Sequence, residues 1–191
     1  MICRYLGPLV LLLVTATAPA VASADAPQRL LATLQGYEWQ LDRAALASLP
    51  ADAWQGYMAI AADAGQAGFV RARAAASLVA YPNDSVWQFY LAAIAGDLPA
   101  GDGPGLNRRR SVESICAAFA AERPAALATV LLPLLEQTDV HLRIQAANCL
   151  QQLDVDSAHA ALAAYRGNIA EDWERRATAN GLQNNARAVT P

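Results

Sequence analysis

The sequence contains no lysine, only two histidines and three cysteines, and few aromatic residues, which make up 7% of its 191 positions. Charged residues make up 16% and the net charge is −3, so the chain lacks the concentrated positive charge by which proteins bind nucleic acid. We therefore expect no nucleic-acid partner. The sequence also lacks Gly-x-Ser-x-Gly, a glycine-rich phosphate loop and His-Glu-x-x-His, the signatures of three common catalytic sites.

The two histidines do not belong to a metal-binding motif. His141 and His159 fall in different predicted helices, and neither stands at a ligand spacing from a cysteine. A zinc site needs three or four converging ligands, and an enzyme needs a positioned acid, base or nucleophile. Because no such set is visible, we expect a protein without enzyme activity, metal or cofactor.

The first 24 residues have the three parts of an export signal. Arg4 supplies the positive start, Leu6–Val14 is an apolar run, and Ala22-Ser23-Ala24 is a small-x-small cleavage site. The run is shorter than the roughly 20 residues that span a bilayer. Residues 1–24 are predicted to be a cleaved signal peptide, so the mature protein is periplasmic or secreted, with no stable membrane insertion. An uncleaved anchor is the alternative.

A short helical pattern recurs four times after residue 70. It begins with Arg, has a small or branched residue four positions later and a branched aliphatic residue seven positions later, all on one helix face. The three positions are occupied by Arg71, Ala75 and Leu78, by Arg108, Val112 and Ile115, by Arg143, Ala147 and Leu150, and by Arg175, Ala179 and Leu182.

An amphipathic helix is predicted before each of these helices. Its apolar residues recur at i, i+3, i+4 and i+7, with stripes that start at Trp54, Trp87, Leu127 and Ala158. No segment alternates with period two, so we predict no strands. The unit is therefore helix, turn, helix over about 35 residues, and since one hairpin cannot bury its apolar face alone, neighbouring units must stack.

The second helix of the unit resembles the motif of HEAT-repeat proteins, in which an Arg stands near the helix start. Residues 141–150 (HLRIQAANCL) and 70–78 (VRARAAASL) carry the resemblance, which extends over about residues 53–183. The chain resembles the exported HEAT-repeat proteins of bacteria. The resemblance implies an all-α fold, a short right-handed α-α superhelix of about four HEAT-like hairpins, and implies little about activity.

Four regions depart from the repeat. Residues 25–52 are predicted to form an N-terminal helical cap over the repeats at 53–183, and residues 184–191 a flexible tail. The Gly- and Pro-rich loop 96–105 is longer than an ordinary turn between repeats. Pro133 falls inside a predicted helix, where it removes a backbone hydrogen bond and should kink the helix.

The four repeated arginines are the most regular polar feature. The HEAT resemblance implies that such arginines pair with acids in a ladder, and Asp139 and Glu171 each precede one of them by four residues. Because an Arg on a core-facing position needs a partner, we interpret the set as structural. A row of anion-binding groups is the alternative. The ladder consists of Arg71, Arg108, Arg143 and Arg175.

Two cysteines occupy equivalent helices of adjacent repeats. Cys116 follows Ile115 and Cys149 precedes Leu150, and export would permit a disulfide between them. A bridge requires Cα atoms within about 7 Å, closer than most packed helices come. The sequence leaves two outcomes open, a disulfide or two buried small side chains.

A polar stripe on the second helices is the predicted partner surface. Positions 2, 5 and 9 after each ladder Arg point away from the apolar face and are polar yet mostly uncharged, and stacked solenoid helices present such a face to extended partners. The alternative is an unused solvated surface. The stripe includes Arg73, Arg110, Glu113, Gln145, Asn148 and Gln152.

These features predict a non-enzymatic protein- or peptide-binding scaffold that is exported across the inner membrane. The run Arg108-Arg109-Arg110 is either a contact for an acidic partner or a solvated helix start. Two other functions stay open. One is a ligand-binding or lyase- or hydrolase-type enzyme subunit that uses the solenoid groove, and the other is a purely structural accessory subunit.

Overall fold

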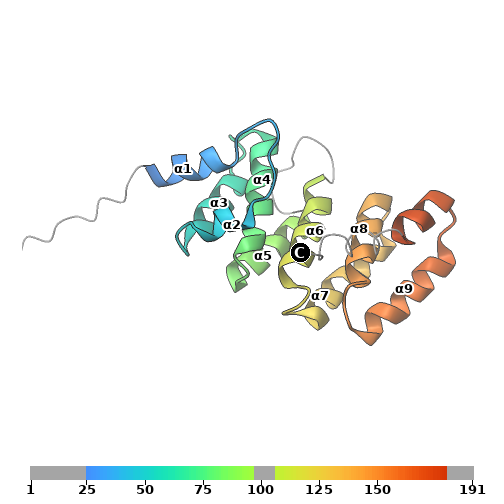
Figure 1. Cartoon of the computed structure of the whole chain (residues 1–191). Coiled ribbons are helices and arrows are strands. Elements are labelled where there is room, and N and C mark those ends of the chain that lie inside the picture. The colour runs from blue at the N-terminus through green and yellow to red at the C-terminus, as the bar shows by residue number, and fades with distance from the viewer. Residues whose placement is uncertain (1–24, 97–105, 180–191) are drawn as a thin grey trace, which may run out of the picture.

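The computed structural model describes residues 25–96 and 106–179, and these residues form helices and connecting turns without a strand (Figure 1). The prediction of an all-α class is confirmed. The predicted signal peptide at 1–24, the predicted tail at 184–191 and nearly all of the loop 96–105 lie outside the described residues.

Each predicted pair of helices is present. We call the first helix of each pair an A helix and the second a B helix. The A helices are α3 (Ala53–Ala62), α5 (Asp84–Ala95), α7 (Pro124–Leu131) and α9 (Asp156–Asn168). The B helices are α4 (Gly68–Ser77), followed by the short 3-10 helix η1 (Leu78–Ala80), α6 (Leu106–Phe119), α8 (Val140–Leu150) and a helix over 172–179.

Local sequence signals set the helix boundaries. The side chain of Asn83 accepts a hydrogen bond from the Val86 amide at the start of α5, and Asp139 does the same at the start of α8. Pro124 occupies the first turn of α7, where its missing N–H costs no helical hydrogen bond. Helix α5 ends at Ala95 and is followed by Gly96, whose φ of 96° is the left-handed conformation that glycine adopts readily.

The B helices lie side by side. Helix α6 packs against both α4 and α8, and α8 meets the 172–179 helix, where Gln151 Nε2 donates to the Thr178 carbonyl at 2.7 Å. Helices α3, α5 and α7 each pack on the B helix that follows, and Tyr165 of α9 donates a hydrogen bond to Glu174 of the 172–179 helix. The pairs succeed one another across the molecule in chain order (Figure 1). One continuous apolar core runs through the array from Leu30 to Leu162.

Two short helices precede the pairs, α1 (Asp25–Thr33) and α2 (Arg43–Ala47). Helix α1 packs on α3, and its Leu30, together with Leu34 just after it, is buried in the common core. The Thr33 hydroxyl lies 2.9 Å from that of Tyr57 in α3. The segment at 25–47 thereby covers the first pair of helices.

Pro133 changes the course of the third A helix. Helix α7 ends at Leu131, and the chain continues as a 3-10 helix, η2 (Leu132–Glu136). The cause is the proline ring, which lacks an N–H and clashes with the preceding turn of an α-helix. The predicted departure from a regular α-helix is thus present.

Candidate functional site

A disulfide joins two neighbouring B helices. Cys116 of α6 is bonded to Cys149 of α8, with the Cα atoms 5.8 Å apart. Of the two outcomes that the sequence leaves open, the structure contains the bridge. The buried side chains beside Cys149 include Ala146 and Ala147, which are small enough for α8 to approach its neighbour closely.

Three of the four ladder arginines bind the end of the preceding A helix. Backbone carbonyls at a helix C-terminus lack partners within the helix and carry partial negative charge, so a guanidinium is favourable there. The fourth, Arg71, is buried at 6% exposure. The three hydrogen bonds join Arg108 Nε to Ile94 O (2.7 Å), Arg143 Nη1 to Gln137 O (2.8 Å) and Arg175 Nη2 to Ile169 O (2.8 Å).

The acids that pair with ladder arginines are Glu174, on the neighbouring B helix, and Asp172, in the preceding turn of the same helix. Asp139 does not pair with Arg143, four residues on, because its carboxylate caps α8 and accepts two hydrogen bonds of 2.9 Å from Arg109 of α6. Arg143 instead binds Glu174 of the 172–179 helix through two bonds of 2.9 Å. Arg175 pairs with Asp172 at 3.4 Å rather than with Glu171.

The pKa of Asp139 reflects its pairing with Arg109. Burial of Asp139 favours its neutral form, but the hydrogen bonds from Arg109 and from the α8 amides outweigh burial, and the pKa of Asp139 lies below its ordinary value. Asp139 is therefore a carboxylate at neutral pH that ties α8 to α6.

The predicted stripe lies along α6 and α8. Arg110 and Glu113 are exposed on α6, and neither forms a hydrogen bond or ion pair with any residue that the structure describes. On the neighbouring helix, Gln145 and Asn148 are half-buried, and Gln152 is exposed just after α8. These five residues place charged groups on one B helix beside amide groups on the next.

Arg73, the sixth stripe residue, binds the N-terminal segment instead. Its Nη1 donates to the carbonyls of Leu34 (2.7 Å) and Gly36 (2.9 Å), and the guanidinium lies over the Trp39 and Phe69 rings. The turn that presents these carbonyls contains Gly36 at φ 110°, a conformation that favours glycine. Arg73 therefore holds the segment before α2 on α4.

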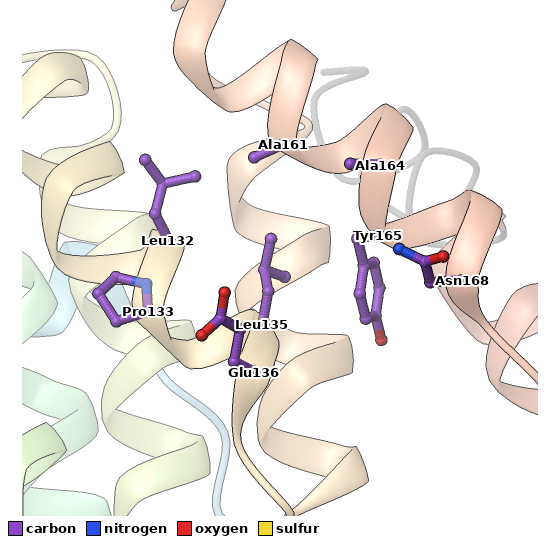
Figure 2. A pocket seen from close by; sticks show the side chains of 8 residues that line it. All are labelled: Leu132, Pro133, Leu135, Glu136, Ala161, Ala164, Tyr165 and Asn168. Atoms are coloured by element: carbon purple, nitrogen blue, oxygen red, sulfur yellow. The ribbon is translucent and has the colours of Figure 1, made fainter.

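A groove opens between η2 and α9. Figure 2 shows η2 residues on one side and α9 residues on the other. The groove has a volume of about 650 Å³. The small side chains of α9 that face it leave this space unfilled. It is lined by Leu132, Pro133, Leu135, Glu136, Ala161, Ala164, Tyr165 and Asn168.

The groove continues into a second cavity of about 350 Å³, which shares Leu135, Glu136, Tyr165 and Asn168 with the first. The second cavity is polar. One of its lining residues is Glu174, which is 3% exposed, binds Arg143 and accepts a hydrogen bond from the Tyr165 hydroxyl. Burial and the hydrogen bond to Glu174 raise the pKa of Tyr165 to about 12. We call the two cavities together the η2–α9 groove.

Sequence reasoning did not anticipate this groove. The residue that shapes it, Pro133, was visible as a helix breaker, and the small residues Ala161 and Ala164 were visible as part of an alanine-rich helix. The space between them depends on how two segments about 30 residues apart come together, which a helix pattern does not contain.

Within 25–96 and 106–179, no group of three or more His, Cys, Asp or Glu side chains could hold a metal ion. None of the helices described there combines the length and the apolar character needed to cross a membrane. Comparisons of the chain with protein families, with curated proteins and with solved structures find no match.

Proposed function

We propose that the chain is an exported, non-enzymatic scaffold of HEAT-like hairpins, wound as a short right-handed superhelix, that binds a protein or an extended peptide along its B helices. The observation that carries this proposal is the exposed pair Arg110 and Glu113, which form no ion pair or hydrogen bond within the described residues. The stripe continues on α8 with amide groups, which bind other molecules without carrying charge.

The chemistry of the stripe suits an extended segment. Side-chain amides such as Gln145 and Gln152 both donate and accept, so they can bind a peptide backbone whatever its sequence. Arg110 and Glu113 can each form a charge-assisted hydrogen bond, which would fix the register of the segment. Arg73 is left out of this surface because the N-terminal segment already occupies its guanidinium.

The way in which the buried acid is bound supports a non-enzymatic role. The Glu174 carboxylate is the most deeply buried acid of the described residues, and both its oxygens accept hydrogen bonds from Arg143 or Tyr165. A carboxylate held in this way is poorly placed to accept a substrate proton. The groove above it is thus better suited to binding than to catalysis.

Export is supported by the disulfide. Buried disulfides between packed helices persist in oxidising compartments and are rare in the cytosol. We expect the intact mass of the exported protein to correspond to a chain that begins at Asp25 and carries one disulfide. A mass that includes residues 1–24 would contradict signal cleavage.

The stripe is tested by two double variants, Arg110→Glu with Glu113→Arg, and Asn148→Ala with Gln152→Ala. Partners captured by the exported protein should be lost or weakened in both. The first variant exchanges the two charges on α6, and the second removes two amide groups from the other half of the surface. Arg166→Glu, on the exposed face of α9, is the matched charge control. Retention of the same partners by both double variants, with unchanged thermal unfolding, would show that the B helices are not the binding surface.

A further inference from the structure

We propose that the η2–α9 groove is a second binding surface, which takes a segment of a partner protein that carries apolar side chains followed by an Arg or Lys. It lies between A helices, whereas the stripe lies on B helices, so either surface can bind without the other. Three features of the groove point to this occupant: its shape, its charge and the helix ends that meet in it.

The first half of the groove is shaped for apolar side chains. Leu132, Pro133 and Leu135 form one wall, and the facing wall is built from Ala161 and Ala164 (Figure 2). Because the α9 side contributes only methyl groups at these positions, about 650 Å³ stays open between the walls. An inserted Leu or Phe side chain would lose its contact with water there.

The second half of the groove is acidic. Three carboxylates line it, Glu136, Glu171 and Glu174, against the single guanidinium of Arg143. Arg143 is matched by Glu174 through two hydrogen bonds. Glu136 and Glu171 are exposed, and their carboxylates form no ion pair with the described residues. The net charge of this half is therefore negative and favours a cation.

Two helix ends add to this preference. Helix η2 ends beside Gln137 and α9 ends beside Ile169, and both residues line the acidic half. Backbone carbonyls at helix C-termini attract positive charge. The chain itself places guanidinium groups there, since Arg143 binds the Gln137 carbonyl and Arg175 binds the Ile169 carbonyl. These two carbonyls already have partners, so what the helix ends contribute is their general preference for positive charge.

The proposal is tested with three fluorescein-labelled peptides of equal length and the full exported chain with its disulfide intact. The first peptide has spaced Leu residues followed by two Arg, the second has Glu in place of Arg, and the third has Ser in place of Leu. Fluorescence anisotropy measures the dissociation constant of each. We expect the Leu–Arg peptide to bind at least about tenfold more tightly than either of the others.

Two pairs of variants locate the binding. Ala164→Trp fills the apolar half and should abolish binding of the Leu–Arg peptide, whereas Ala163→Trp, on the exposed side of the same helix and outside the groove, should not. Glu136→Gln with Glu171→Gln should remove the preference for Arg over Glu, whereas the exposed Glu122→Gln should preserve it. Circular dichroism and thermal unfolding verify that each variant is folded.

Several results would overturn the proposal. Equal affinity for the Arg and Glu peptides would contradict the charge preference, and equal binding by Ala164→Trp and Ala163→Trp would place the peptide elsewhere. An increase in peptide affinity in Arg187→Glu would show that residues 180–191 of this chain occupy the groove. If the parent chain forms dimers and Ala164→Trp dissociates them, the occupant of the groove is a second copy of this chain. Loss of peptide binding in the Arg110 and Glu113 charge-exchange variant would assign the peptide to the stripe.

Discussion

Around η2 and α9, neighbouring B helices and neighbouring A helices are joined in different ways. Earlier in the chain the A helices also share an ion pair, between Asp84 of α5 and Arg123 just before α7. Between the B helices, a disulfide links α6 to α8. Two ion pairs, each with two hydrogen bonds, join Arg109 to Asp139 and Arg143 to Glu174. Between η2 and α9 on the A side, the facing side chains leave a groove (Figure 2).

This difference shows how a small helical array can be stable and still expose a binding cavity. The cross-links from α6 to α8 and from α8 to the 172–179 helix hold these B helices together, so η2 and α9 do not have to fill the space between them. Alanine on α9 and the 3-10 turn after Pro133 then leave room for an outside segment. The following predictions test this division, from the largest expected effect to the smallest.

Removal of the disulfide should have the largest effect on stability. The bridge closes a loop with a sequence separation of 33, and a loop of that length is expected to contribute about 4 kcal/mol to the free energy of unfolding. Cys116→Ala with Cys149→Ala should lose this amount in urea denaturation, and reduction of the parent chain should lower its midpoint similarly. If the urea midpoint of the parent chain were unchanged under reductant, the stability of the B-helix side would not depend on the disulfide.

Leu150→Ala should destabilise the chain by about 3 kcal/mol, because Leu150 is fully buried and its truncation leaves a cavity. The groove residue Leu132 is half-buried and provides the comparison. Leu132→Ala should cost about 1 kcal/mol, since part of that side chain already meets solvent. Thermal and urea unfolding measure both losses. Equal losses would contradict the contrast between a filled B side and an open A side.

Glu174→Gln should cost about 2 kcal/mol, because it removes the charge that matches the half-buried Arg143. It should also lower the pKa of Tyr165 from about 12, since the Tyr165 hydroxyl would no longer donate to a carboxylate. Urea unfolding and ultraviolet titration of tyrosine report the two effects. Glu171→Gln, at an exposed residue, is the control and should change neither.

The Asp139 pair should make stability depend on acid pH. The folded-state pKa of Asp139 lies below the unfolded value of about 4, so the unfolded chain binds more protons there. Its contribution is present above that value and is lost as the pH falls through the folded-state pKa. Asp139→Asn should therefore be about 1 kcal/mol less stable at pH 7 and lose less stability on acidification. If the free energy of unfolding of the parent chain and of Asp139→Asn fell in parallel as the pH is lowered, the pairing of Asp139 with Arg109 would be contradicted.

The helices were predictable from the sequence because apolar residues repeat with the period of a helix, and Asn83, Pro124 and Asp139 mark helix starts. Contacts between units were less predictable. Asp139 stands four residues before Arg143, yet its partner is Arg109 of the preceding B helix. Local spacing cannot show this, because the choice depends on how two helices about 30 residues apart are placed.

The candidate sites illustrate the same limit. The exposure of Arg110 and Glu113 could be predicted from their position on the helix. The binding of Arg73 to the N-terminal segment could not, because it depends on the turn at Gly36. Whether Cys116 and Cys149 could bond depended on the distance between two helix axes.

Hydrogen–deuterium exchange of the full exported chain, with and without the unlabelled Leu–Arg peptide, tests the division between the two sides most directly. We predict that amides of α6 and α8 exchange most slowly in the absence of peptide, because the disulfide and the Arg109–Asp139 pair hold these helices together. With peptide, protection should increase in η2 and α9 and stay unchanged in α6. Increased protection in α6 and α8, or in no segment, would contradict the account.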